Sequence, residues 1–298
     1  MEQNQNPYED YVYCISASTN FKKDGLVFAA KKSGLFSSRD KGKTWKDSYA
    51  SLRLAAPLAT STAAISIVNE ITYVFAGIEG KILRSLNAGE TWEVADLDSP
   101  APQVAALAVS PNFAKDGTLL AATVQDGIFR STDRGVSWTG WNFGLFDPNI
   151  NCVAFADSQT IFAGTQSGIF RSNNAGRSWR DLDLPIDCAP VLCLSVDRAG
   201  IIYAGTEAEG LHVSCDQGKT WEQLSVGTVE QIHLDASGKL LILKDGELLI
   251  SENSGCSWKA ARLGFEPASK ISAMTAPLGL DPSRPLLVGL SNGDIIKL

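Results

Sequence analysis

The stretch Ser38–Trp45, with the sequence SRDKGKTW, is the first of six copies of one eight-residue pattern in this chain of 298 residues. All six copies follow the form S-x-[DN]-x-G-x-[ST]-W, and successive Trp residues are 37 to 47 residues apart. The other copies are Ser85–Trp92, Ser131–Trp138, Ser172–Trp179, Ser214–Trp221 and Ser251–Trp258. An internal repeat of about 40 residues therefore organises the chain.

Each repeated residue of the pattern has a structural role. Asp and Asn side chains accept hydrogen bonds from backbone amides further along and so close a tight turn. The Gly two positions later adopts a positive φ without strain. The turn residues alternate as Asp40, Asn87, Asp133, Asn174, Asp216 and Asn253. We expect each turn to lead one Trp into packing between neighbouring units, where all six should be largely buried; these residues are Trp45, Trp92, Trp138, Trp179, Trp221 and Trp258.

Short apolar segments flank every turn and indicate antiparallel strands. One strand precedes the turn, as in residues 127–130, two lie further upstream, and a fourth follows the Trp. Residues 271–297 contain a seventh set of the first three strands. A four-stranded unit of this length is typical of a propeller blade. The sequence thus predicts an all-β fold, a single seven-bladed β-propeller over residues 1–298 with four-stranded antiparallel blades.

Blade 7 lacks a fourth strand of its own, because the sequence stops at Leu298. Residues 3–8 are the only segment without an assigned strand. We expect them to pair with residues 294–298 as the outer strand of blade 7, since an open blade would expose an unpaired edge.

Composition and charge disfavour several classes of function. The 26 Lys and Arg residues against 33 Asp and Glu residues give a net charge of −7, which disfavours a nucleic-acid binder. No apolar run approaches the roughly 18 residues of a membrane span. The polar N-terminus lacks the apolar region of a secretory signal, so we expect a cytoplasmic protein.

The cysteines and histidines do not form a metal-binding pattern. Six Cys occur without a CxxC pair, and only two His are present, so we expect no metal and no cofactor. Cys14, Cys152 and Cys193 fall in apolar, strand-like runs, where we expect buried free thiols.

The S-x-D-x-G-x-T-W turn resembles the Asp box, also called the BNR repeat, and the resemblance covers nearly the whole chain. Asp boxes occur in sialidases, two-domain xyloglucanases, sortilin-type receptors and photosystem II assembly-factor propellers. In size and blade count the chain is nearest to the assembly factors and to uncharacterised bacterial BNR-repeat proteins. The resemblance implies the propeller fold, but such a set does not share one function.

The sialidase function that the resemblance suggests requires an Arg-Ile-Pro motif and three convergent Arg residues. The chain has no Arg-Ile-Pro, and Arg84, Arg130 and Arg171 recur once per blade, so they should diverge. A xyloglucanase requires two propellers and a much longer chain. We therefore favour a non-catalytic binding or assembly scaffold with a protein or small-molecule partner on one face. The alternative is an enzyme that acts on a glycan or another small molecule at the channel mouth.

One propeller face should carry the loops from the second to the third strand and from the fourth strand to the next blade. Propellers commonly bind ligands on that face. Trp141 is the only Trp outside the six turns, and it either packs between blades or anchors a binding patch. The nearby acidic residues are either ordinary solvent-exposed side chains or the carboxylate pair of a glycosidase. The candidate ligand- or partner-binding residues are Trp141, Phe143, Phe146, Asp126, Asp147, Asp187, Glu207 and Glu209.

Blade 1 is strongly basic, although the chain as a whole is acidic. Lys22, Lys23, Arg39, Lys41 and Lys43 fall on loops that should share the opposite face. They form either a solvated surface or a docking patch for an acidic partner or an anionic surface.

Overall fold

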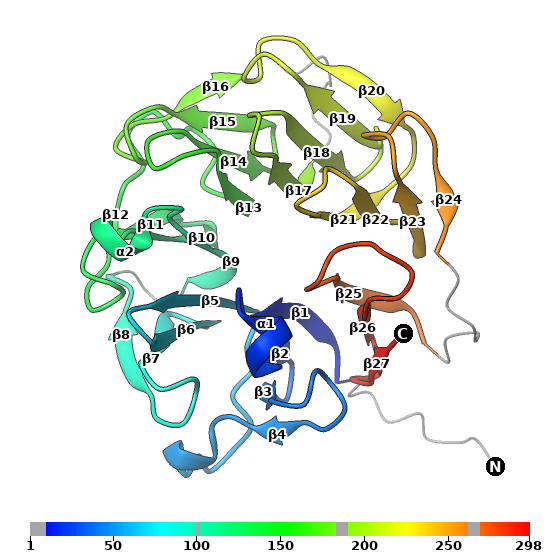
Figure 1. The fold of residues 1–298 in the computed structure, drawn as a ribbon. Helices are drawn as coiled ribbons and strands as arrows, with labels where there is room; N and C mark the ends of the chain where they lie inside the picture. Colours follow the sequence, from blue (N-terminus) through cyan, green and yellow to red (C-terminus); the bar gives the residue numbers. More distant parts are fainter. Residues whose placement is uncertain (1–9, 99–101, 183–189, 262–268) are drawn as a thin grey trace, which may run out of the picture.

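A computed structural model describes residues 10–98, 102–182, 190–261 and 269–298. Seven antiparallel sheets stand around a central axis, in chain order (Figure 1). This arrangement confirms the predicted all-β, seven-bladed propeller. Within each blade the strands a, b, c and d follow one another from the axis outward, as the alternation of short strands and tight turns requires.

Blades 1 to 4 each have four strands. Blade 1 contains β1 (Val12–Ala17), β2 (Val27–Lys31), β3 (Gly34–Ser38) and β4 (Lys46–Asp47). Blade 2 contains β5 (Thr62–Val68), β6 (Ile71–Ile78), β7 (Lys81–Ser85) and β8 (Glu93–Asp96). Blade 3 contains β9 (Gln103–Val109), β10 (Leu119–Val124), β11 (Gly127–Ser131) and β12 (Thr139–Gly140). Blade 4 contains β13 (Ile150–Phe155), β14 (Ile161–Thr165), β15 (Ile169–Ser172) and β16 (Arg180–Leu182).

Blades 5 to 7 complete the ring. Blade 5 contains β17 (Val191–Val196), β18 (Ile202–Thr206), β19 (Leu211–Ser214) and β20 (Glu222–Ser225). Blade 6 contains β21 (Val229–Leu234), β22 (Leu240–Lys244), β23 (Glu247–Ser251) and β24 (Lys259–Ala260). Blade 7 contains β25 (Ile271–Thr275), β26 (Leu287–Leu290) and β27 (Ile295–Lys297). Its sheet has three strands in the described part of the chain, and the predicted closing strand, residues 3–8, lies outside that part.

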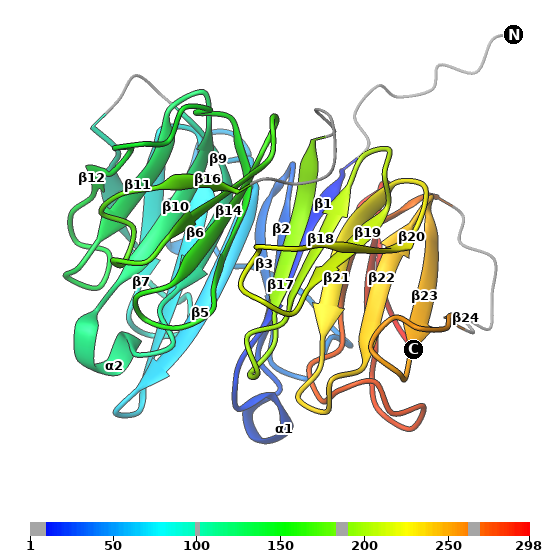
Figure 2. The same ribbon diagram turned by 90° about the horizontal axis from the view of Figure 1, so that it is seen from above.

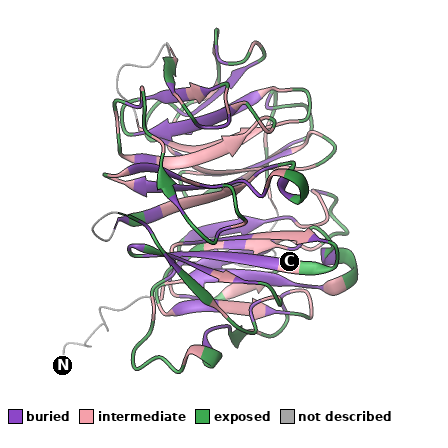
Figure 3. Ribbon diagram, turned by 90° about the vertical axis from the view of Figure 1, so that its left-hand side faces the viewer, coloured by how far each residue is buried: buried purple, intermediate pink, exposed green. Residues whose placement is uncertain are grey.

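The loops divide between two faces. The a–b and c–d loops lie on one face together with the short helices α1 (Phe21–Asp24) and α2 (Phe113–Asp116), and we call it the a–b face (Figure 2). The b–c and d–a loops lie on the other, which we call the b–c face. The 3-10 helix η1 (Ala50–Leu52) follows strand d of blade 1. Buried residues lie mainly along the strands, whereas many of the loops are exposed (Figure 3).

The six repeated turns close as the sequence predicts. In the first box, Oδ1 of Asp40 accepts the backbone amides of Lys43 and Thr44 at 3.0 and 2.9 Å. The backbone amide of Gly42 donates to Oγ of Ser38 at 2.9 Å. The repeated Ser, Asp, Gly and Thr of the pattern therefore act inside their own turn.

The alternation of Asp and Asn reverses one hydrogen bond and leaves the turn intact. In the Asp box, the hydroxyl of Thr44 donates to Oδ2 of Asp40 at 2.7 Å. In the Asn box, Nδ2 of Asn87 donates to the hydroxyl of Thr91 at 2.9 Å, while Oδ1 still accepts the Thr91 amide. Because the hydroxyl can donate or accept, Asp and Asn both close the turn.

The carboxylate boxes make stability sensitive to acid. The pKa of Asp216 is lowered to about 2, chiefly by the hydrogen bond from the backbone amide of Thr220, and the pKa values of Asp40 and Asp133 are also lowered. Folded pKa values below the unfolded value of about 3.9 stabilise the fold above about pH 4 and lose this effect as the pH falls towards 2.

We therefore expect the triple variant Asp40→Asn, Asp133→Asn, Asp216→Asn to lose less stability than the wild type between pH 4 and pH 2. The substituted boxes would have the side chains that the other three boxes already use. Urea midpoints at pH 6 and pH 3 measure the difference. An equal loss in both proteins would show that other groups control the acid sensitivity.

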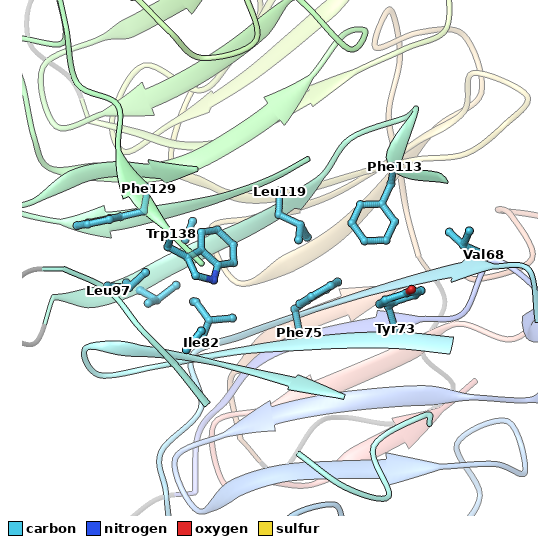
Figure 4. Close-up of a cluster of buried hydrophobic side chains, with 12 residues drawn as sticks. Val68, Tyr73, Phe75, Ile82, Leu97, Phe113, Leu119, Phe129 and Trp138 are labelled. Atoms are coloured by element: carbon cyan, nitrogen blue, oxygen red, sulfur yellow. The ribbon is translucent and has the colours of Figure 1, made fainter. Parts of the chain in front are cut away.

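The Trp that ends each box packs against the preceding blade. In the cluster between blades 2 and 3, Trp138 lies with Ile82, Leu97 and Phe129 (Figure 4). All six box Trp residues occupy such clusters, which confirms the predicted packing between blades. Between blades 6 and 7, where no box follows, Leu and Ile side chains such as Leu248 fill the interface instead.

Burial of the six Trp residues is less uniform than the sequence predicts. Trp138 and Trp179 are buried, whereas Trp45, Trp92, Trp221 and Trp258 are half-buried. The connection that follows strand d of the preceding blade contacts buried and half-buried Trp residues alike: Nε1 of Trp179 donates to the carbonyl of Trp141 at 2.9 Å, and Nε1 of half-buried Trp92 donates to the carbonyl of Ser48 at 2.8 Å. The repeated sequence therefore places every Trp between two blades, and the depth of its burial differs from blade to blade.

Candidate functional site

The segment of residues 141–149, which we call the aromatic loop, joins β12 to β13 on the b–c face. Phe143 and Phe146 are 82% and 85% exposed. Leu145, between them, is buried in the core cluster shared by blades 3 and 4. The loop thus holds two exposed aromatic rings on either side of a buried anchor.

Blade 4 fixes the backbone of the aromatic loop. The backbone amide of Trp179 donates to the carbonyl of Phe143, and Nε1 of Trp179 donates to the carbonyl of Trp141, both at 2.9 Å. Gly144 has a φ of 81°, and a Cβ at this residue would lie 2.3 Å from the carbonyl oxygen of Trp179. Glycine is therefore required for this close approach.

Two side chains clamp the ends of the aromatic loop to neighbouring b–c turns. The side chain of Asn142 accepts the backbone amide of Ile128 at 2.8 Å and donates to the carbonyl of Asp126 at 3.0 Å. Asp147 accepts the backbone amide and the hydroxyl of Ser167 at 2.8 and 2.7 Å. The loop is consequently tied to blades 3 and 4 at both ends.

Trp141 is half-buried rather than exposed like the two phenylalanines. The guanidinium of Arg130 lies over its ring at 5.2 Å from the centroid. Its carbonyl holds Trp179, as described above. The structure therefore places Trp141 at the base of the aromatic loop, where it contributes to packing.

The predicted acidic residues differ in their surroundings. Oδ1 of Asp147 also accepts the backbone amide of Asn149 at 3.0 Å, so both of its oxygens hold the loop. Burial raises the pKa of Asp147, but these hydrogen bonds together outweigh burial and lower it. Glu207 and Glu209 lie exposed between β18 and β19, and Asp187 lies outside the described residues. Asp147 thus stabilises the loop, and a catalytic pair that includes it would have to break these bonds.

The repeated Arg residues diverge, as expected from their spacing. Arg84 pairs with Glu93 on the next strand of its own blade. Nη1 of Arg171 donates to the carbonyl of Gln217 in the following box at 2.9 Å. Together with Arg130 over Trp141, they make three separate structural contacts.

Four of the five predicted basic residues surround one hollow of about 410 Å³ on the a–b face of blade 1. They are Lys23, Arg39, Lys41 and Lys43, whereas Lys22 is exposed outside its lining. Lys297 at the end of β27 also lines the hollow. Sequence spacing missed Lys297, because it comes from the far end of the chain and only ring closure brings it near blade 1.

A larger cavity of about 730 Å³ opens on the a–b face, where the ends of β1, β21 and β25 meet. His233, Asp235, Thr275 and Arg284 line it. Burial lowers the pKa of His233. The connection from β25 to β26 builds one wall of the cavity, and the sequence analysis did not predict it.

Within the described ranges, no group of three or more His, Cys, Asp or Glu residues could hold a metal ion. The same residues include no helix that is both long and apolar enough to span a membrane.

Comparisons with known proteins support the fold. No protein-family model and no curated protein sequence matches this chain. A GH74 xyloglucanase from Xanthomonas campestris has a TM-score of 0.77 and 18% identity over 97% of this chain. The extracellular domain of the one-component system BT4673 from B. thetaiotaomicron has a TM-score of 0.74 and 18% identity over 98%. This chain spans 52% and 38% of those two chains.

YCF48 matches the chain along its whole length. YCF48 from Cyanidioschyzon merolae has a TM-score of 0.69 and 14% identity over 100% of this chain and 98% of its own. A second YCF48 structure, with a TM-score of 0.71 and 14% identity, contains a bound D1 peptide. At these identities the comparisons establish a seven-bladed propeller that resembles sensor-domain, glycanase and peptide-binding propellers.

Proposed function

We propose that this propeller is a non-catalytic binding module that recognises a protein partner through the aromatic loop. The observation that carries the proposal is the exposure of Phe143 and Phe146 on a backbone held rigidly by Trp179. The two rings would insert into an apolar groove of the partner.

Physical reasons favour a binding role for this pair. Aromatic side chains dominate the energy of protein interfaces when they become fully desolvated. A loop that is already fixed loses little conformational entropy on binding, so more of the contact energy contributes to affinity. The buried Leu145 and the clamp of Asp147 supply this rigidity.

The similarity to YCF48 supports a peptide- or protein-binding role. That propeller covers the same length and binds a D1 peptide. The present chain shares its fold, and the partner of this chain is to be found by experiment.

Photo-crosslinking in native cells tests the proposal. A photoreactive amino acid at position 143 should crosslink one protein reproducibly, and the variant Phe146→Ser should reduce the yield several-fold. Val226→Ser is the matched control, because Val226 is also apolar, 67% exposed and on a d–a connection of the same face. An equal reduction of the crosslinking yield by Val226→Ser would count against a specific site at the aromatic loop.

The glycanase alternative makes a separate prediction. We expect the purified protein to show no turnover above background with a panel of fluorogenic glycosides that includes sialosides and xyloglucan oligosaccharides. A retaining or inverting glycosidase needs two carboxyl groups roughly 5 to 10 Å apart across the sugar. Turnover that is lost in Asp126→Ala or Glu207→Ala would favour the enzyme over the binding module.

A further inference from the structure

The basic hollow on the a–b face of blade 1, described above, is assembled by two close contacts. The backbone amide of Lys41 in the first box donates to the carbonyl of Gly25, which follows α1, at 3.1 Å. A Cβ at Gly42 would lie 2.7 Å from Cδ2 of Leu287 on β26, and Leu287 pairs with Lys297 on β27. Three segments of the chain, one of them from its far end, therefore meet around one hollow of about 410 Å³.

The basic hollow carries an excess of positive charge. Its described lining has five cationic residues against the carboxylates of Asp24 and Asp40, a net charge of +3 in a chain whose net charge is −7. One oxygen of each carboxylate accepts a hydroxyl group of its own turn, at 2.6 and 2.7 Å. Within the described ranges the four lysines of the lining form no ion pair, and Arg39 pairs only with Glu90, at 3.3 Å. Most of the positive charge in the hollow is therefore available to an anion.

Blade 3 contains the same local structure without the same charge. The turn of α1 recurs as α2, and in both blades the fourth box residue donates its backbone amide to the glycine that follows the helix, at 3.1 and 3.0 Å. The third box, however, has Thr132 and Val136 where the first box has Arg39 and Lys43. This turn therefore forms without the two cations, which favours a binding role for them over a structural one.

The lining of the basic hollow is chemically uniform. Only charged residues and one glycine line it in the described part of the chain, so a peptide or a nucleobase finds no apolar or aromatic surface to pack against. Lysine ammonium groups act as compact charges towards phosphate, and a guanidinium can bind two phosphate oxygens at once. A second hollow of about 300 Å³ shares Arg39 and Asp40 with the first and adds Lys46. The arrangement favours a ligand with several phosphate groups and little apolar surface.

We propose that the basic hollow binds a small polyanion with two or more phosphate groups, such as a di- or triphosphate. The phosphate oxygens accept hydrogen bonds from the four lysines and from Arg39, in place of its exposed pair with Glu90. Such an exposed ion pair is weak, so its loss costs little. A volume of about 410 Å³ lies within the range of about 300 to 1,000 Å³ that is usual for small-ligand sites. The site is separate from the aromatic loop, which lies on the opposite face.

Isothermal titration with sodium tripolyphosphate at about 50 mM salt tests the proposal, and we expect one site per chain. The double variant Arg39→Thr, Lys43→Val should raise the Kd at least about tenfold, because two charge-assisted contacts are lost. Blade 3 already has these residues in the same turn, so the melting temperature should stay within about 3 °C of the wild type.

The double variant Lys115→Ala, Lys219→Val is the matched control. It also removes two exposed cations from turns of the a–b face, and Lys219 is the sixth residue of its box, as Lys43 is of the first. The control should change the Kd less than about threefold, because both lysines lie outside the hollow. An equal loss of affinity in the two double variants would overturn the proposal, because it would show general attraction of anions to this face.

Two further ligands distinguish the sources of negative charge. A penta-glutamate peptide that binds more tightly than tripolyphosphate would overturn the proposal in favour of an acidic protein partner. No binding of tripolyphosphate to the wild type would overturn it as well. Sedimentation with vesicles that contain phosphatidylinositol 4,5-bisphosphate, reversed by tripolyphosphate, would support the proposal with the phosphates on a lipid headgroup. Tripolyphosphate binding without sedimentation would support it with a soluble ligand.

Discussion

Trp179→Ala should lower the free energy of unfolding by about 3–5 kcal/mol. Trp179 is 3% exposed and lies in the cluster between blades 3 and 4 with Leu120, Ile161 and Phe170. Its removal leaves a cavity and also deprives the carbonyl of Trp141 of its donor. Urea denaturation followed by circular dichroism measures the loss.

Trp141→Ala is the matched comparison and should cost clearly less, on the order of 1–2 kcal/mol. Trp141 is half-buried, and its backbone carbonyl, which holds Trp179, survives the substitution. Equal losses at the two positions would show that the Trp141 ring packs as fully as a box Trp. In that case Trp141 would be a packing residue and would lie outside the proposed binding surface.

Deletion of residues 3–8 should lower the melting temperature by about 10 °C, because blade 7 would lose the strand that we expect to cover it. The described chain begins at Asp10, whose side chain accepts the backbone amide and the hydroxyl of Ser33, both at 2.8 Å. Lys31 donates to the carbonyl of Gly293, in the turn that leads into β27. Asp10, the first described residue, therefore lies near the turn that leads into β27.

Replacement of residues 3–8 by a Gly-Ser segment of equal length separates strand pairing from chain length. We expect the replacement to be as destabilising as the deletion, because flexible Gly-Ser residues form strands poorly. A melting temperature within about 2 °C of the wild type in both variants would show that blade 7 is stable with three strands.

The repeated turn residues predicted the fold because each of them acts inside its own turn. Asp40 and Gly42 close their turn locally, so their spacing alone indicates blade number and strand order. The box Trp residues were also placed correctly between blades. Their unequal burial was not predicted, because the repeated residues are the same in all six boxes, whereas the surroundings of each Trp differ from blade to blade.

The candidate functional surfaces were harder to predict from the sequence than the fold. Phe143 and Phe146 stood out as aromatic residues, but only the structure shows that they are exposed on a fixed backbone. Asp147 stood out as an acid, and its two oxygens prove to hold the loop. Residues from opposite ends of the chain, such as Lys297 in the basic hollow, come together only through ring closure.

Affinity for the partner identified by crosslinking is the most direct test of the binding function. Isothermal titration should give a Kd at least about 30-fold weaker for the double variant Phe143→Ser, Phe146→Ser, which corresponds to the loss of about 2 kcal/mol expected at a hot spot. The control Val226→Ser should stay within about threefold of the wild type. A double variant that binds as tightly as the wild type, while it remains folded, would contradict the assignment of the aromatic loop as the binding surface.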